Sequence, residues 1–218
     1  METAAAFETF PALDALPGIA HAFTRRVSGF DVKVDRDIAL QRLDDAHRAI
    51  REQIGVATRP FIIGEQIHAA AVAIVDAATA AAVPGADGLI TADPRVCLGV
   101  HVADCAPVFL IHPARRVIAL VHSGRRGTEL GVVPAAIARL VADFGCDPAG
   151  IVAQIGPCIR PPHYETDFAA AIVAQCRAAG LVHIHDCGTC TATHVDRYYS
   201  YRAERGKTGR LLALLALR

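Results

Sequence analysis

Side chains able to do chemistry stand at the ends of short apolar runs in the middle of the chain. Cys105 comes just before one such run, and His122 ends another and leads into a glycine-rich turn that contains Arg126. Runs of about four to eight residues rich in Val, Ile and Leu indicate buried strands. Binding and catalytic residues are commonly held where a rigid strand meets a loop. We therefore expect the functional site within residues 85–127.

Two histidines and a cysteine offer two kinds of catalysis if the fold brings them together. His68, Cys105 and His122 would form a catalytic zinc site with three protein ligands and an open fourth position. Zinc in such a site lowers the pKa of a bound water to about 7. Without a metal, Cys105 could be a nucleophile with His122 as its base, or it could pack as a small buried side chain. The spacing of the three residues is long and irregular, and it leaves these alternatives open.

The glycine-rich turn after His122 is a candidate anion site. Its glycines let the backbone approach a ligand, and the helix that we predict over residues 128–144 directs its N-terminus at the same turn. Arg126 in this turn, and Arg25 after an earlier predicted strand, carry the planar guanidinium that suits a phosphate or a carboxylate. An ordinary turn with solvated arginines accounts for the same residues.

Potential metal ligands also crowd the segment after residue 181. They are His183, His185, Asp186, Cys187, Cys190 and His194. Cys187 and Cys190 form a C-x-x-C pair, which could be half of a zinc site or a redox pair. No second C-x-x-C completes a four-cysteine site, and no thioredoxin-like pattern surrounds this one. We therefore do not assign the pair a function.

Short strands and helices must position these residues. Apolar runs predict strands over residues 19–23, 60–64, 70–75, 96–102, 107–111, 117–121, 151–155 and 211–217. Apolar residues at helical spacing predict helices over residues 37–55, 128–144 and 168–179. Residues 76–83 fit either a helical turn or a loop. Because no repeat or linker interrupts the pattern, we predict one domain over residues 1–218.

The composition limits the classes of partner and location. Lys and Arg together number 22, as do Asp and Glu, so no net charge attracts nucleic acid or an acidic membrane. The sequence contains no uninterrupted apolar run of about 18 residues, so we predict no membrane span. The first residues lack the features of a secretory signal, so we expect a cytoplasmic protein. In that compartment the seven cysteines are expected to be thiols or ligands rather than disulfides.

Motifs along nearly the whole chain match one known family. They lie at residues 66–68 (Q-x-H), 86–91 (A-D-G-L-I-T), 103–107 (A-D-C-x-P), 122–127 (H-x-G-R-R-G), 155–165, 190–202 and 208–210 (T-G-R), and a further match surrounds His21 and Arg25. The chain thus resembles the YfiH family, also called the laccase-domain or polyphenol-oxidoreductase family. The resemblance implies a single-domain α+β fold with mixed β-sheets packed against helices.

The resemblance also implies a reaction and its residues. Members are described as zinc-dependent purine nucleoside enzymes that cleave adenosine, inosine or methylthioadenosine with phosphate and also deaminate adenosine. The implied partners are therefore a small-molecule nucleoside and phosphate. The residues that carry over are the zinc ligands His68, Cys105 and His122, the catalytic Arg126, and the substrate-binding Arg25, Gln66 and Asp104. Arg25 and Arg126 would contact phosphate or ribose.

Departures from the family pattern leave two other functions open. Arg125 replaces the tryptophan of the family's H-x-G-W-R-G motif, and Ala69, Val102 and Ala203 are further differences. A zinc-containing ligand-binding protein without turnover would be compatible with these changes. A copper-dependent oxidase of phenols is the other alternative, but the ten histidines are scattered along the chain, whereas a multicopper centre needs many grouped together. The oligomeric state is left open.

Overall fold

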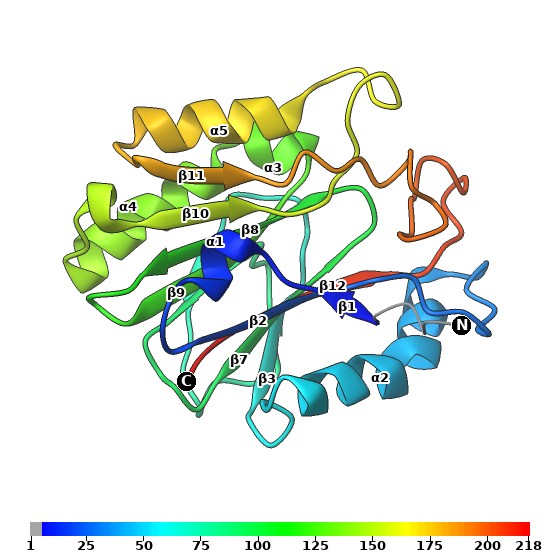
Figure 1. Ribbon diagram of the computed structural model, residues 1–218, viewed down its shortest axis with the longest axis horizontal. Helices are drawn as coiled ribbons and strands as arrows, with labels where there is room; N and C mark the ends of the chain where they lie inside the picture. The colour runs from blue at the N-terminus through cyan, green and yellow to red at the C-terminus, as the bar shows by residue number, and fades with distance from the viewer. Residues whose placement is uncertain (1–5) are drawn as a thin grey trace.

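Two mixed β-sheets stack face to face, with helices on both outer sides (Figure 1). The structure is a computed structural model that describes residues 6–218. Each sheet combines parallel and antiparallel neighbours, for example β7 with β3 and β7 with β12. The predicted α+β class with mixed sheets packed against helices is therefore confirmed. The expectation about a secretory signal falls partly on residues 1–5, which lie outside the described residues.

The first sheet, called sheet A, has the strand order β1-β2-β12-β7-β3-β5. Its strands are β1 (Phe7–Glu8), β2 (Ile19–Thr24), β3 (Phe61–Gly64), β5 (Ala82–Val83), β7 (Cys97–Val102) and β12 (Leu211–Leu217). The second, sheet B, has the order β11-β10-β8-β9-β6-β4. Its strands are β4 (Val72–Ile74), β6 (Gly88–Thr91), β8 (Ala106–His112), β9 (Val117–Ser123), β10 (Val152–Ile155) and β11 (His183–Asp186).

Helices cover the outer faces of the two sheets. They are α1 (Pro11–Asp14), α2 (Arg36–Gln53), α3 (Arg125–Glu129), α4 (Val132–Phe144) and α5 (Phe168–Ala178) within residues 6–218, with a 3-10 turn η1 (Pro148–Gly150). Figure 1 shows α2 along the side of sheet A, and α3, α4 and α5 on the side of sheet B. No helix in the described part of the chain combines the length and the apolar composition that a membrane crossing requires.

The central strands are apolar along their whole length because both faces of each sheet are covered. In β12, Leu211 and Leu215 pack in the core between the sheets, whereas Leu212 and Leu214 pack in the outer cluster that includes Ile50 of α2. This alternation follows from successive side chains pointing to opposite faces of a strand. Two buried faces explain why the predicted strands read as continuous hydrophobic runs.

The helix predicted over residues 128–144 is in fact two helices. α3 starts earlier than predicted and ends at Glu129, and α4 starts at Val132. Gly131 separates them with a φ of 77°, in the left-handed region that glycine adopts without steric cost. The element whose N-terminus meets the turn after His122 is therefore the short α3.

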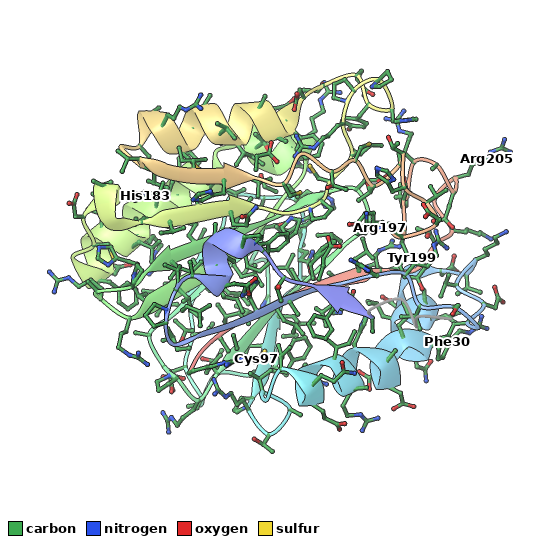
Figure 2. All side chains as sticks on the ribbon, in the orientation of Figure 1. Phe30, Cys97, His183, Arg197, Tyr199 and Arg205 are labelled. Carbon is green, nitrogen blue, oxygen red and sulfur yellow. The ribbon has the colours of Figure 1, made fainter. Side chains whose placement is uncertain are left out.

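Several short or polar elements were not predicted. They are β1, α1, β6 and β11, and residues 76–83 form a turn that leads into β5. The strand β11 is a polar edge strand whose side chains are largely exposed, so it lacks the apolar pattern on which the prediction depended. His183, labelled in Figure 2, starts this edge strand.

One end of the sandwich collects the loops that matter for function. β12 begins where β7 ends, with Leu211 opposite Val102, and β8 begins where β9 ends, with Pro107 opposite His122. Residues 194–210 lead into β12 at this end. The buried Tyr199 (Figure 2) anchors this segment by donating a hydrogen bond of 3.1 Å to the carbonyl oxygen of Val27.

Candidate functional site

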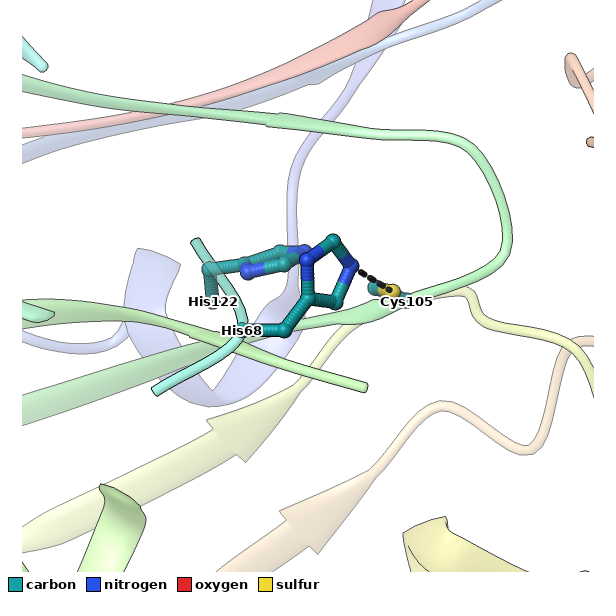
Figure 3. A group of neighbouring side chains, drawn as sticks. All are labelled: His68, Cys105 and His122. Carbon is teal, nitrogen blue, oxygen red and sulfur yellow. Dashed lines mark hydrogen bonds between the residues drawn. The ribbon is translucent and has the colours of Figure 1, made fainter. Parts of the chain in front are cut away.

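His68, Cys105 and His122 converge at this end of the sandwich (Figure 3). His68 follows β3 of sheet A, Cys105 lies in the connection from β7 to β8, and His122 belongs to β9 of sheet B. One donor atom from each residue lies within 4.8 Å of the other two, and Cys105 Sγ is 3.9 Å from His68 Nε2. Within residues 6–218 these three form the one such cluster of potential metal ligands. The structure therefore offers one possible His-Cys-His metal site, at the residues that the resemblance implies.

Asp87 orients this cluster, and the sequence analysis did not identify it as a site residue. Its Oδ1 lies 2.8 Å from His122 Nδ1 and accepts from the backbone N–H of His68 at 3.0 Å. Its Oδ2 accepts from the N–H of Ala69 at 2.8 Å. A buried carboxylate on one ring nitrogen leaves the other nitrogen free for a metal. The position of Asp87 in the motif at residues 86–91 was the available signal, but its role depends on contacts across the sheets.

The charges of Cys105 and His122 are coupled. Burial alone would raise the pKa of the Cys105 thiol, but the neighbouring His122 and His68 lower it below its ordinary value. Burial alone would lower the pKa of His122, but the Cys105 thiolate and Asp87 raise it. The pair therefore favours a thiolate facing an imidazolium. A thiolate is the form of cysteine that binds metals and attacks electrophiles.

The donor set fits zinc. Two imidazole nitrogens and one thiolate are ligands that zinc takes in catalytic sites, with the fourth position left for water or substrate. Gly124 makes room beside the sulfur, because a Cβ at this position would lie 2.5 Å from Cys105 Sγ. His68 is the exposed member of the set and His122 is buried, so the open side of the cluster faces outward.

Three residues of the site have backbones in the left-handed region. Gln66, His68 and Asp104 have φ values of 60°, 61° and 87°. Such conformations cost about 1–3 kcal/mol each in non-glycine residues and concentrate at functional sites. The surrounding contacts must therefore hold these segments in place.

Gln66 and Asp104 supply part of that support. The Gln66 side chain donates to the carbonyl oxygen of His101 at 2.6 Å and accepts from the His101 N–H at 3.0 Å. Asp104 accepts from Thr191 Oγ1 and from the N–H of Arg202, both at 2.7 Å. Gln66 thus ties the His68 segment to β7, and Asp104 ties the Cys105 segment to the C-terminal part of the chain.

A cavity of about 470 Å³ opens beside the three ligands. Its lining combines five of the predicted site residues with cations and aromatic rings. The cations and rings are Arg36, Arg125, Arg202, Arg210, Tyr164, Phe168 and Tyr201. Sites of this volume, with aromatic walls and a few convergent polar groups, are typical of small-molecule binding.

The structure brings five of the seven predicted site residues to this cavity and leaves two arginines outside its lining. Those on the cavity are Gln66, His68, Asp104, Cys105 and His122. Arg25 instead donates to Glu8 at 3.1 Å, and Arg126 is exposed on α3. Arg125 lines the cavity, where it pairs with Glu129 and Glu165. The cavity arginines other than Arg125 were missed because they are far apart in the sequence.

The cysteines of the C-terminal segment lie apart from this cavity lining. Cys187 and Cys190 are free thiols, and the backbone of Cys190 pairs with that of the free cysteine Cys158 in an isolated parallel β-bridge. Burial raises the pKa of Cys158 and of Cys187. Cys158 and Cys187 therefore lack the activation that Cys105 receives from its histidines.

Family comparison gives a match to the model described as multi-copper polyphenol oxidoreductase laccase, over residues 22–171 and 163–218. The chain belongs to this family. The resemblance inferred from the sequence motifs is thereby confirmed.

Sequence relatives of this chain carry a name that differs from the description of the family model. The purine nucleoside phosphorylase SCO2081 of Streptomyces coelicolor is 35% identical over 187 residues, which are 73% of this chain and 76% of that protein.

Further relatives cover almost the whole chain. A purine nucleoside phosphorylase of Deinococcus radiodurans is 31% identical over 96% of this chain and 95% of its own length. Among solved structures, YlmD of Geobacillus stearothermophilus superposes with a TM-score of 0.86 at 25% identity, covering 100% of this chain and 98% of that one. YfiH of Bacillus licheniformis has a TM-score of 0.80 at 21% identity, covers 92% of this chain and 93% of its own, and supports the fold.

Proposed function

We propose that this protein is a zinc-dependent purine nucleoside phosphorylase that also deaminates adenosine. The observation that carries the proposal is the His68, Cys105 and His122 cluster at the wall of a cavity lined with arginines and aromatic rings. The names of relatives that are 31–35% identical support the choice of a purine nucleoside and phosphate as substrates. A location in the cytoplasm belongs to the same proposal.

The three ligands would hold the zinc, which when bound would supply a Lewis acid and a water of lowered pKa. Asp87 keeps the ring of His122 in one orientation through the bond at Nδ1. Gln66 fixes the segment that carries His68 against β7. These residues therefore hold the site in its geometry before a substrate enters. The free energy needed to order the site during the reaction is lower as a result.

The aromatic rings of the cavity suit a purine base. Tyr164 and Phe168 lie edge to face with ring centroids 5.8 Å apart, and Tyr201 lines the same cavity. Stacking of a base on an aromatic side chain contributes about 1–3 kcal/mol. Guanidinium groups in the lining would meet the phosphate, since they match its geometry with paired N–H donors.

The family description favours one other function, a copper-dependent oxidase of phenols. Multicopper chemistry needs several copper sites close together. Within residues 6–218 the potential ligands form one cluster of three, with a single thiolate and two imidazoles. This ligand set suits one metal ion, and it favours the nucleoside reaction over the oxidase.

Product analysis tests the proposal. Purified protein of measured zinc content would be incubated with adenosine and phosphate, and the products separated by chromatography. Adenine with ribose 1-phosphate is the expected result of phosphorolysis, and inosine is the expected result of deamination. Neither product from a zinc-loaded sample would overturn the proposal and favour a ligand-binding protein. Arg125→Trp would then test whether the family's tryptophan restores turnover.

The Cys105→Ala variant tests the ligand assignment. Loss of one ligand of three should remove most of the bound zinc and all activity, because the remaining two donors hold zinc weakly. Cys146→Ala is the matched control, since Cys146 is a free buried cysteine outside the cavity lining. A Cys105→Ala variant that keeps one zinc per chain would contradict the assignment.

A further inference from the structure

The four arginines that line the cavity differ in their partners. Arg125 and Arg202 both pair with Glu165, at 3.4 Å and 3.2 Å. Arg36 pairs with its exposed neighbour Asp37 at 3.3 Å. Arg210 has no carboxylate within salt-bridge distance in residues 6–218. Arg210 is thus the one among the four that forms no ion pair with a described carboxylate, and Asp104 acts on its charge from a longer distance.

Backbone contacts hold Arg210 in a defined orientation. Its Nη1 donates to the carbonyl oxygens of Thr208 at 2.9 Å and Gly209 at 3.0 Å. Among the described residues, no acceptor is bonded to its Nε or Nη2, so these donors stay available for a ligand. A guanidinium that is already oriented loses little freedom when it binds an oxyanion.

Arg210 lies close to the metal ligands. It directly precedes β12, whose first residue pairs with Val102, three positions before Cys105. Arg210 and Cys105 line the same cavity. An anion bound to Arg210 would therefore lie in the compartment where the substrate meets the metal site.

Arg36 adds a second positive charge beside Arg210. Both line the cavity, although one starts α2 and the other precedes β12. Burial first, and then the nearby Arg36, lower the pKa of Arg210, and these two effects outweigh the opposite effects of Tyr201, Cys105 and Asp104. Two neighbouring guanidinium groups repel each other until an anion lies between them. Arg125 and Arg202 share Glu165, and Arg125 also pairs with Glu129. Arg210 has no such ion pair, so the pair that contains it is the better anion site.

We propose that Arg210, with Arg36 beside it, binds the phosphate that reacts with the nucleoside. This assignment rests on the proposed phosphorylase function. A phosphate oxygen would form a bond to ribose C1′ while the C1′–N9 bond breaks. The electron pair of that bond leaves with the purine, which takes up the proton of hydrogen phosphate, and the products are free base and ribose 1-phosphate. Arg210 and Arg36 hold the phosphate during this exchange.

Titration calorimetry with inorganic phosphate tests the site. The zinc-loaded parent, Arg210→Gln, Arg36→Gln and Arg210→Lys would be titrated in a buffer free of other oxyanions. Loss of a charge-assisted hydrogen bond should weaken phosphate binding about tenfold or more in Arg210→Gln and less in Arg36→Gln. Arg210→Lys should recover part of the affinity. Arg48→Gln, which changes an exposed arginine of α2 that pairs with Asp45, is the control and should bind like the parent.

Kinetics then separate the site from the reaction. The KM for phosphate should rise in Arg210→Gln with zinc content unchanged. The assignment would be overturned if folded Arg210→Gln and Arg36→Gln bound phosphate as tightly as the parent, or if the parent bound no phosphate. It would also be overturned if Arg126→Gln lost phosphate binding instead. A parallel titration with adenosine 5′-monophosphate shows whether the anion is free phosphate or the phosphate group of a nucleotide. If the substitutions weakened binding of this nucleotide alone, the assignment to free phosphate would be overturned. Phosphate binding through Arg210 without release of adenine would reject the phosphorylase function but not the site.

Discussion

Asp87 and Gly124 lie where they would control whether the three proposed ligands can share one metal ion. Asp87 bonds to one ligand ring and to the backbone that carries another. Gly124 leaves the space that the sulfur of Cys105 occupies. Neither residue is a ligand, yet each acts on the distance between ligand atoms. Substitutions at both positions should therefore change metal affinity before they change the fold.

Asp87→Asn should lower zinc affinity about 10- to 100-fold, the usual effect of losing a carboxylate that orients a ligand histidine. The amide keeps the shape of the side chain but lacks the charge and one acceptor. Competition with a fluorescent zinc chelator measures the affinity. Asp147→Asn is the control, because Asp147 accepts a backbone bond at the start of η1, outside the cavity lining. Equal zinc affinity in Asp87→Asn and the parent would remove Asp87 from this role.

Gly124→Ala should displace the Cys105 side chain, because the added Cβ would lie 2.5 Å from Sγ. We expect a loss of bound zinc and of activity. Gly127→Ala is a matched control, since its Cβ would meet its nearest neighbour, a methyl group of Val132, at 3.4 Å. Metal analysis and circular dichroism separate loss of zinc from loss of fold. A fully metallated Gly124→Ala protein would show that the turn adjusts without cost to the site.

Among the elements, residues 194–210 show how a segment without regular structure can form a cavity wall. Glu204 accepts hydrogen bonds from Arg26 Nη2 at 2.7 Å, Thr208 Oγ1 at 2.5 Å and the Ser200 N–H at 3.1 Å. These bonds close the segment on itself and fasten it to the strand exit after β2. The segment then presents Tyr201 to the cavity. The Glu204 carboxylate therefore acts together with Tyr199 and Asp104 to hold the segment in place.

Stability should depend on pH through Glu204. Burial would raise its pKa, but the bonds from Arg26, Thr208 and Ser200 lower it below the ordinary 4.5. The stabilisation is therefore present above the unfolded-state pKa and is lost as the pH falls through the lower folded-state value. Glu204→Gln should cost about 1–3 kcal/mol of unfolding free energy at pH 7, and this difference from the parent should shrink below pH 4.

Urea unfolding at pH 7 and at pH 3.5 measures that difference. Glu129→Gln, which removes the exposed partner of Arg125, should change the free energy of unfolding by less than about 1 kcal/mol. A difference between Glu204→Gln and the parent that stays constant from pH 7 to pH 3.5 would show that the charge of Glu204 has no part in stability.

How far an element could be predicted from the sequence depended on its burial. The runs at 107–111 and 211–217 were predicted because β8 and β12 are covered on both faces. The exposed β11 carries no such pattern, and the break at Gly131 depends on a backbone angle that its neighbours do not reveal. The proposed zinc ligands were assigned from family resemblance, since their spacing alone was ambiguous. Arg210 and Asp87 lie within matched motifs, but the roles proposed for them depend on contacts between distant segments.

For the whole molecule, the candidate metal site joins the two sheets. His68 follows β3 of sheet A, His122 lies on β9 of sheet B, and Cys105 lies where the chain passes between them. A metal held by all three would bind the folded chain and not the unfolded one. Such a ligand stabilises the fold in proportion to the logarithm of its concentration over its dissociation constant.

Removal of the metal should therefore lower the melting temperature. At a free zinc concentration of about 1,000 times the dissociation constant, the stabilisation is about 4 kcal/mol, which corresponds to about 8–16 °C for a chain of this size. Calorimetry before and after chelation measures the shift. The Cys105→Ala variant should melt at the same temperature with and without zinc, and a shift as large as that of the parent would argue against this ligand set.

The position of the three ligands also bears on the order of events during folding. The pairing of β8 with β9 in sheet B brings Cys105 beside His122. His68 follows β3 of sheet A and joins them only when the sheets stack, which is a slow step in folds dominated by contacts distant in sequence. A metal that acquires a visible absorption band on binding thiolate, such as cobalt, would therefore colour the protein only after the sheets have docked. During refolding in the presence of cobalt, the appearance of this absorption would report the time of the final step of assembly.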